Sequence, residues 1–326
     1  MLEKENSRRE FIKQTSFAGL GTFLVMGSTP SLFANIFGSN NEPIIDIHQH
    51  TNYHGRSNEH LIGHQRAMGI TTTILLPAGH PVSYGSTHYG VSNGLQAEAT
   101  ANEACYEVAQ LYPKEFFFGA NEVPDVPGAT REIEKYLKLG AFMIGESKFN
   151  VECDSPEMQN IYKLAHAYNV PVLMHWQYNM YNRGFDRFHK MLKKYSKVNF
   201  IGHAQTWWAN IDKNHKDQNI LYPTGKVTPG GLTDRLLSDY SNMYGDLSGS
   251  SGLNALTRDE ENTREFLKRH QDKLLYGSDC EDTEGRGPAC EGAQAITAIR
   301  KLSAGKEIER KLLFENAKKI LRLQLA

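Results

Sequence analysis

The sequence predicts an α/β protein folded as a (β/α)8 TIM barrel. Short apolar runs alternate with longer amphipathic stretches, and eight such runs can be counted. Apolar strands regularly followed by helices imply parallel pairing, and eight of these units close into a barrel. About 290 residues follow the N-terminal segment, which is a normal length for this fold. An open doubly wound sheet is the alternative, but no GxGxxG turn follows the first expected strand.

The first 34 residues have the layout of an export signal. The stretch "SRREFIK" at residues 7–13 contains paired arginines, a short apolar region covers residues 17–26, and small residues lead to Ala34. This order is typical of a twin-arginine signal, whereas an amphipathic helix with a chance arginine pair is the alternative. The apolar region is well short of the roughly 20 residues that span a bilayer. No cysteine stands directly after this region, so we expect no lipid anchor there and no stable membrane anchor.

These features predict three segments and a location. Residues 1–34 form the signal, 35–43 a linker, and 44–326 the barrel domain. We expect the twin-arginine translocation machinery to export the folded protein to the periplasm or another extracytoplasmic space. The sequence leaves the formation of a homo-oligomer open.

The strands and helices can be placed from their apolar patterns. Each strand is a short apolar run, and each helix shows apolar residues at helical spacing. The expected strands cover residues 44–48, 71–76, 115–120, 141–146, 170–175, 198–203, 242–247 and 274–278. The expected helices include residues 101–112, 130–139, 157–168, 185–195, 261–270, 289–302 and 308–323.

Potential metal ligands follow these strands where each one ends. The first strand runs into "HQH", and alternation along a strand places His48 and His50 on the same face. Four further strand ends carry a histidine or a carboxylate: Glu146 in "AFMIGE", His175 in "VPVLMH", His203 in "VNFIGH" and Asp279 in "LLYGSD". In barrels the carboxyl ends of the strands carry the chemistry, so these side chains should converge.

The combination predicts a metal site, although any one of these residues alone more often packs or hydrogen-bonds. Neutral imidazole and carboxylate suit zinc, manganese or iron, and a catalytic site keeps one position open for water. We expect one or two divalent ions, with zinc as the first choice.

Composition and charge indicate which kinds of partner to expect. Hydrophobic residues make up 40% of the chain, enough for a large core, and the formal net charge is −1. Neither nucleic acid nor an anionic membrane is therefore an expected partner, and a small-molecule substrate is. The four cysteines, Cys105, Cys153, Cys280 and Cys290, lack a metal-type spacing. We interpret them as free thiols, although Cys280 and Cys290 could pair in an oxidising compartment.

The order of the motifs resembles a known family. "DIHQH", "LMH", "FIGH" and "YGSD" resemble the amidohydrolase superfamily of metal-dependent hydrolases, specifically its amidohydrolase-2 (aminocarboxymuconate-semialdehyde-decarboxylase-like) branch. "HQRAMGITTTILLPAG", "YPKEFFFGANEVP", "MYGDLSGSSG" and "LLFENAKKIL" are similar as well. The likeness covers residues 44–323. It implies His48, His50, His175 and Asp279 as metal ligands, with His203 binding a second metal or polarising the substrate.

The fourth strand leaves two candidates. Binuclear members of the family bridge two metals there with a carboxylate or a carbamylated lysine, whereas mononuclear members need no ligand. "GESKF" offers both Glu146 and Lys148. We choose Glu146 as the ligand because it directly follows the apolar run. The alternative is a buried ion pair between the two, and Lys148 could also hold a substrate carboxylate.

The expected chemistry is hydrolysis of an ester, lactone or amide in a small substrate, with cyclic and carboxylated compounds among the candidates. A bound metal lowers the pKa of its water to about 7. Asp279 would accept the proton of this water as general base, and His203 or the metal would polarise the carbonyl. The first alternative is non-oxidative decarboxylation or hydration on the same barrel. A more remote one is a non-catalytic exported binding protein.

Long loops at the barrel mouth predict further substrate contacts. They cover residues 78–94, 204–231 and 280–288, and they supply Trp207 and Arg286. Tyr53 and His54, just beyond the first histidine pair, are candidates too. The remaining histidines in helical patterns are predicted at the surface: His60, His64, His166, His189 and His270.

Overall fold

The computed structural model describes residues 42–87, 95 and 98–325. The predicted export signal, residues 35–41 of the predicted linker and most of residues 88–97 lie outside the described residues. From Pro43 onward the chain forms one compact unit.

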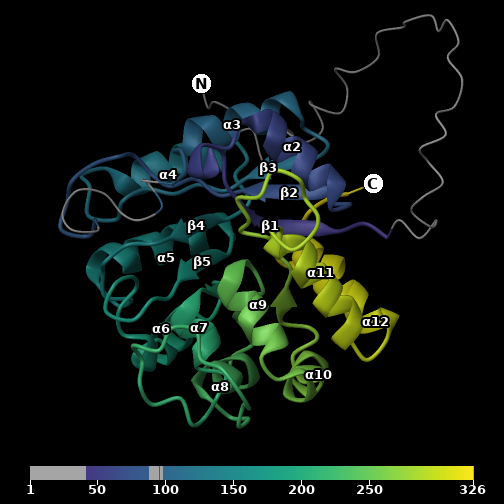
Figure 1. The fold of residues 1–326 in the computed structure, drawn as a ribbon. Helices are drawn as coiled ribbons and strands as arrows, with labels where there is room; N and C mark the ends of the chain where they lie inside the picture. Colours follow the sequence, from purple (N-terminus) through teal and green to yellow (C-terminus); the bar gives the residue numbers. More distant parts are fainter. Residues whose placement is uncertain (1–41, 88–94, 96–97, 326) are drawn as a thin grey trace, which may run out of the picture. The chain divides into compact units, whose positions relative to one another are not determined.

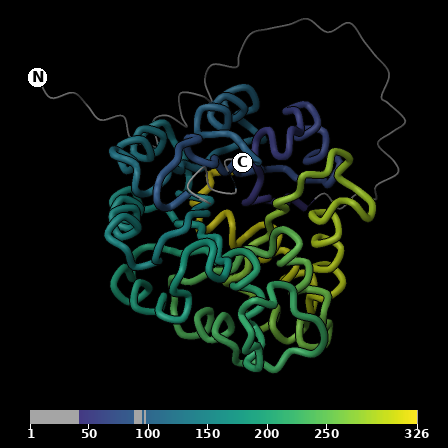
Figure 2. Tube along the Cα trace, turned by 60° about the vertical axis from the view of Figure 1, so that its left-hand side comes forward, coloured from purple at the N-terminus to yellow at the C-terminus, as the bar shows by residue number. Residues whose placement is uncertain are grey.

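Eight parallel strands form the centre of this unit, and the chain visits them in sequence order (Figures 1 and 2). They are β1 (Ile45–Gln49), β2 (Thr72–Leu75), β3 (Phe116–Phe118), β4 (Ile144–Ser147), β5 (Val172–His175), β6 (Phe200–His203), β7 (Met243–Asp246) and β8 (Leu274–Leu275). Every one lies within a predicted strand or extends it by one residue, so the predicted positions are confirmed.

The strands form two ladders, β1–β3 and β4–β8, that are joined by hydrogen bonds at both seams. Between β3 and β4, Ala120 bridges Ile144 in parallel. Between β8 and β1, the Ile47 N–H donates to the Tyr276 carbonyl at 3.2 Å. The Asp279 N–H donates to the His48 carbonyl at 2.8 Å. The second seam places the end of the last strand beside the first strand.

The helices surround this sheet (Figure 2). Those that the apolar pattern predicted are α3 (Asn102–Leu111), α4 (Ala129–Lys138), α5 (Pro156–Tyr168), α6 (His189–Lys194), α10 (Glu260–Arg269), α11 (Glu291–Leu302), α12 (Lys306–Arg310) and α13 (Asn316–Leu321). Four more were not placed: α2 (Asn58–Ala67), α7 (Gln205–Ala209), α8 (Leu232–Asp239) and α9 (Gly249–Thr257). A π-helical turn, Lys311–Glu315, joins α12 to α13. No helix among the described residues is long and apolar enough to cross a membrane.

Local sequence signals fix the ends of α5. The Ser155 side chain accepts a hydrogen bond from the Met158 N–H, and Pro156 occupies the first turn. Both are favourable helix starts, because the serine caps a free N–H and proline has none to lose. At the other end, Asn169 adopts φ +54°, a left-handed conformation that stops the helix. The helix therefore delivers the chain to β5 and its terminal histidine.

Two tryptophans pack directly against the sheet at glycine positions. A Cβ on Gly202 would lie only 2.4 Å from the Trp207 ring, so β6 needs glycine there. Trp207 is 0% exposed and Trp208 is 2% exposed. The structure therefore places Trp207 in the core and not where it could contact a substrate. The sequence pattern could not show this, because the five-residue helix α7 that turns the ring inward was read as loop.

Two predicted surface histidines are buried. His64 is 0% and His270 is 3% exposed, and the prediction for both is wrong. His270 donates to Asp234, while His64 faces two cysteines.

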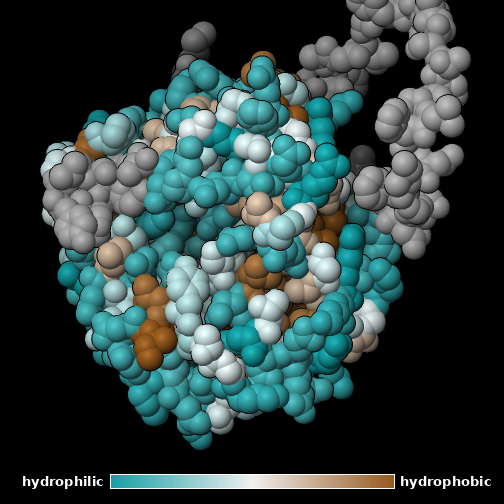
Figure 3. All heavy atoms as spheres, in the orientation of Figure 1, coloured by the Kyte–Doolittle hydropathy of each residue, from teal (hydrophilic) through white to brown (hydrophobic). Residues whose placement is uncertain are grey.

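On the surface in view, apolar residues gather near α9 and α11 (Figure 3). Residues such as Leu253, Thr297 and Ala298 line a cavity of about 370 Å³ between these helices, which contains none of the strand-end ligands.

Candidate metal centre

The pair of histidines at the end of β1 forms the first part of the centre. His48 and His50 are both 0% exposed, and their Nε2 atoms lie 3.2 Å apart. They share one face, as alternation along the strand predicts. Two nitrogen donors so close can bind one cation together.

Glu146, at the end of β4, lies between two groups of histidines. Its Oε2 atom is 3.5 Å from the Nε2 atoms of both His48 and His50. Its Oε1 atom is 2.5 Å from His175 Nδ1 and 3.7 Å from His203 Nε2. Each carboxylate oxygen therefore faces a different pair of imidazoles.

Asp279 closes the centre from the end of β8. Its Oδ1 atom lies 3.7 Å from His48 Nε2 and 3.4 Å from His50 Nε2, and its Oδ2 atom lies 3.4 Å from His203 Nε2. The residue has φ +43°, which is uncommon for a residue other than glycine, and its N–H is anchored on the His48 carbonyl. The backbone thus holds this carboxylate over the histidines.

The opposite ring nitrogens are held by fixed acceptors. His48 Nδ1 donates to Asp246 Oδ2 at 2.7 Å, and His50 Nδ1 donates to the Leu76 carbonyl at 2.7 Å. His203 Nδ1 lies 2.9 Å from Ser248 Oγ, which itself donates to Asp246. Such partners fix the tautomer and leave Nε2 free to face a cation.

Asp246, which ends β7 in "MYGD", is the functional residue that the sequence reasoning missed. It is 0% exposed and contacts both His48 and His203. The sequence contained the signal, because Asp246 ends β7 and a second aspartate, Asp279, follows β8. It could have been found by applying the strand-end rule to all eight strands.

The buried carboxylates of the centre favour their charged forms. Burial alone would raise the pKa of Glu146, but His175 and His48 outweigh it and hold that pKa well below its usual range. Burial is likewise outweighed at Asp279, where His48 and His203 keep the pKa well below normal. Burial lowers the pKa of His175 to about 4, so this imidazole is neutral. Burial also opposes the charged forms of His48 and His203, but the carboxylates around them outweigh it and raise both pKa values, so a cation that binds here would displace protons from these two imidazoles.

The residues present fit a divalent cation. Three overlapping triads have donor atoms within 4.8 Å of one another: His48–His50–Glu146, His48–His203–Asp279 and Glu146–His175–His203. The buried Oδ1 atom of Asp279 has no hydrogen-bond partner among the described residues. A buried carboxylate oxygen without a donor is costly unless a cation satisfies it. All six predicted strand-end residues therefore meet in one centre.

The predicted substrate contacts lie at different depths around this centre. The ring of Tyr53 packs edge-on against His50, with centroids 4.8 Å apart. Lys148 Nζ lies 3.3 Å from Glu98 Oε2 and over the Tyr181 ring, and its side chain is 13% exposed.

The two others are exposed. His54 pairs with Glu281 at 3.1 Å, and its side chain is 45% exposed. The Arg286 side chain is 76% exposed and lies 3.9 Å from Glu284. Tyr53 and Lys148 are thus close to the centre, whereas Arg286 points into solvent.

Neither a family model nor a curated protein matches the sequence. Solved structures do match in fold. A probable 2-pyrone-4,6-dicarboxylic acid hydrolase from Acinetobacter baumannii, with citric acid bound, is 14% identical, with a TM-score of 0.53, covering 86% of this chain and 99% of that chain. A putative amidohydrolase from Staphylococcus aureus is 14% identical, with a TM-score of 0.53, covering 86% and 100%.

A third similar structure is 5-carboxyvanillate decarboxylase from Novosphingobium aromaticivorans, solved with bound manganese. It is 15% identical, with a TM-score of 0.51, covering 81% of this chain and 80% of that chain. The chain shares the fold of these structures. At these identities the likeness establishes the fold, and the chemistry must be argued from the centre itself.

Proposed function

We propose that the protein is a metal-dependent hydrolase that cleaves an ester, lactone or amide bond in a small carboxylated substrate. The observation that carries the proposal is the position of Glu146, whose two oxygens face two separate pairs of histidines. A carboxylate in this arrangement suits the bridge of a two-metal centre. His48, His50 and Asp279 would hold one ion, and His175 and His203 the other.

The bound ions would lower the pKa of a bound water and polarise the scissile carbonyl of the substrate. Asp279 is the residue placed to accept the proton of the attacking water, because its Oδ1 atom is buried and unpaired among the described residues. The low pKa of Asp279 keeps its carboxylate ionised at neutral pH, the form that can accept a proton. The same carboxylate would return the proton to the leaving group, and Asp246 would keep His48 and His203 oriented throughout.

Lys148 supports a carboxylated substrate. Burial alone would lower the pKa of Lys148, but Glu146, Glu98 and Asp279 raise it, so the amine remains a cation. Lys148 directly follows β4 and lies two residues after Glu146. A charge-assisted hydrogen bond from its amine could orient a substrate carboxylate. The similar hydrolase is described as acting on a pyrone dicarboxylic acid, a substrate with both a ring ester and carboxylates.

Non-oxidative decarboxylation is the second candidate. Proteins of the same fold include decarboxylases of 5-carboxyvanillate and 2,6-dihydroxybenzoate, both of which act on a carboxylated ring. A centre with one ion and with Glu146 only hydrogen-bonded to His175 would favour this reaction. Manganese and zinc both suit the nitrogen and oxygen donors.

The periplasm is the proposed location of the protein, because residues 1–34 have the layout of a twin-arginine signal.

The test is a product analysis with the purified protein. The protein is stripped with a chelator, reloaded with Zn²⁺ or Mn²⁺, and offered a panel of carboxylated aromatic lactones, aryl esters and hydroxybenzoic acids. We expect ring opening or ester cleavage that needs the metal, with no release of carbon dioxide. Carbon dioxide release without hydrolysis would replace hydrolysis by decarboxylation. The same product formation in stripped and reloaded protein would contradict metal dependence.

A further inference from the structure

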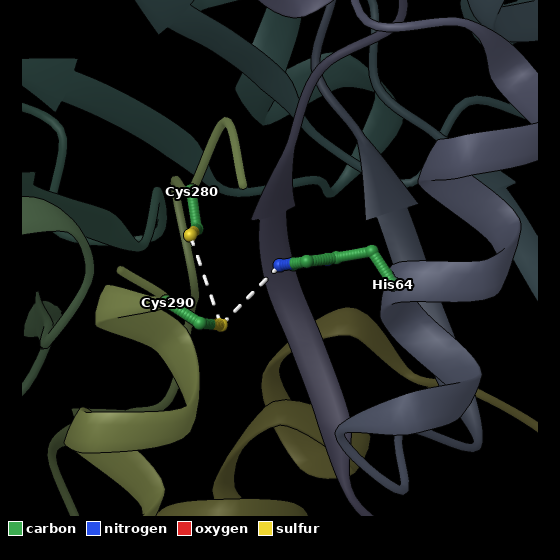
Figure 4. A group of neighbouring side chains, drawn as sticks. All are labelled: His64, Cys280 and Cys290. Carbon is green, nitrogen blue, oxygen red and sulfur yellow. Dashed lines mark hydrogen bonds between the residues drawn. The ribbon is translucent and has the colours of Figure 1, made fainter. Parts of the chain in front are cut away.

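A second cluster of side chains that could bind a metal lies apart from the strand-end centre. His64 on α2, Cys280 after β8 and Cys290 at the start of α11 point toward one another (Figure 4). They are 0%, 3% and 0% exposed. Elements from opposite ends of the sequence thus bring one nitrogen and two sulfur donors into a buried position.

Two of the three distances between the donors match a tetrahedral site, and all three lie within 4.8 Å. Cys280 Sγ lies 3.9 Å from Cys290 Sγ, and Cys290 Sγ lies 3.4 Å from His64 Nε2. With Zn–S near 2.3 Å and Zn–N near 2.0 Å, tetrahedral angles place two sulfurs about 3.8 Å apart and a sulfur and a nitrogen about 3.5 Å apart. The observed separations differ from these values by roughly 0.1 Å.

We infer that His64, Cys280 and Cys290 form a structural site for a thiophilic divalent cation of the zinc class. Two thiolates and a neutral imidazole would balance the charge of such an ion, which suits a position this deeply buried. A disulfide fits less well, because the sulfur atoms would have to approach from 3.9 Å to about 2.05 Å.

Two further donors lie at the edge of the cluster. Asp282 Oδ2 is 4.0 Å from His64 Nε2, and Met68 Sδ is 3.6 Å from Cys290 Sγ. The carboxylate is the donor that suits zinc, and closing the fourth position with it would complete a structural site. Asp282 Oδ2 also accepts hydrogen bonds from the N–H groups of Glu284 and Gly285, which hold the loop around it.

The position of the cluster suggests its purpose. Cys280 directly follows Asp279, and its carbonyl accepts hydrogen bonds from Gln49 Nε2 at 2.9 Å and Arg56 Nη1 at 2.8 Å. The Cys290 side chain caps α11 by accepting from the Ala293 N–H. An ion here would therefore tie the segment after β1 to the segment after β8, the two strands that carry His48, His50 and Asp279.

Cobalt substitution tests the site without any substrate. The full mature protein is stripped under reducing conditions and titrated with Co²⁺, and absorption from thiolate-to-cobalt charge transfer is recorded. None of the six strand-end ligands contains sulfur, so this absorption reports only on a cysteine site. We expect it in the wild type and in Glu146→Ala, and we expect its complete loss in the Cys280→Ser/Cys290→Ser double variant.

The other buried cysteines provide matched controls. Cys105→Ser and Cys153→Ser should keep the absorption, because these thiols lie apart from the cluster. Elemental analysis of protein purified without chelator should show one equivalent less metal in the double variant than in the wild type. Folded wild type that gives no thiolate–cobalt absorption would overturn the inference. So would a titration of denatured wild type, purified without reductant, that finds two free thiols in place of four.

Discussion

The peptide bond between Asp279 and Cys280 joins the two clusters of this barrel, yet thiols occur in only one of them. The strand-end centre combines four imidazoles with carboxylates, and the other cluster combines one imidazole with two thiols. Oxygen donors leave a cation acidic and accessible to water, whereas two thiolates neutralise it. Only the first cluster contains a carboxylate placed to carry a proton.

This difference shows how one strand end can serve catalysis and stability together. The Asp279 carboxylate lies among the strand-end histidines, whereas the next side chain, Cys280, lies near His64 on α2 and Cys290 at the start of α11. Catalysis needs a site with an open position for water, and a structural ion needs a closed one. The following predictions test that division, from the largest expected effect to the smallest.

Asp279→Asn should have the largest effect on the rate. The amide cannot accept the proton of the attacking water, and general acid–base groups contribute about 100- to 10,000-fold. We expect kcat to fall by about that factor, measured on the best substrate of the panel. The thiolate–cobalt absorption of the neighbouring cluster should remain, because its donors are untouched. A rate close to that of the wild type would remove Asp279 from the mechanism.

Asp246→Ala should weaken the strand-end centre without changing its ligands. Loss of the partner that orients His48 and His203 should reduce the affinity for Zn²⁺ about 10- to 100-fold. The affinity is measured by competition with a chromophoric chelator. Asp239→Ala, an exposed residue at the end of α8, is the matched control and should bind like the wild type. Equal affinities in both variants would contradict the orienting role.

Lys148→Met should affect substrate binding more than the chemical step. A hydrogen bond to a charged group is worth about 1.5–3 kcal/mol, so KM for a carboxylated substrate should rise about 10- to 100-fold. The kcat value should change little, and an uncharged ester should be hydrolysed as by the wild type. An equal loss for both substrates would show that Lys148 serves the centre through Glu146 instead.

Asp234→Asn should change stability alone. Burial raises the pKa of Asp234, but His270 at 2.6 Å and Arg269 outweigh it and lower the pKa from 3.8 to about 2. Because the folded pKa is the lower one, the stabilisation is present above about pH 4 and is lost as pH falls toward 2. Arg269 is partly exposed, so we expect a loss of only about 1 kcal/mol at pH 7.

Denaturant unfolding of both proteins at pH 7 and near pH 3 measures this loss, which should shrink at the lower pH. The metal content should not change, since His270, the partner of Asp234, belongs to neither cluster. A drop in bound metal would show that a buried histidine–carboxylate pair outside the centre also supports it.

The strand ends could be predicted because they depend on local pattern. A short apolar run that ends in histidine or carboxylate defines both the strand and the side of the barrel where its last residue lies, as for His175 and His203. The six predicted metal-ligand candidates therefore appear together in the structure. Asp246 follows the same rule and was overlooked only because the rule was applied to too few strands.

The remaining features depend on contacts between distant segments. His64 and Cys290 are 226 positions apart, and their approach requires α2 and α11 to pack on neighbouring strands across the β8–β1 seam. Trp207 was assigned to the mouth because the short helix α7 has no periodic signal. His270 was assigned to the surface because the helical pattern of residues 261–270 does not reveal its contacts with Asp234 and Phe266. No spacing rule within one element could have predicted these positions.

The most direct test of the central claim is the metal content of the purified protein and of Glu146→Ala, measured by elemental analysis without chelator treatment. Glu107→Ala, an exposed position on α3, is the matched control. Because the difference between proteins is measured, any ion at the cysteine cluster cancels. A two-metal centre bridged by Glu146 predicts at least one equivalent less divalent metal in Glu146→Ala and no change in Glu107→Ala. Equal metal in all three proteins, or no divalent metal in the wild type, would contradict it.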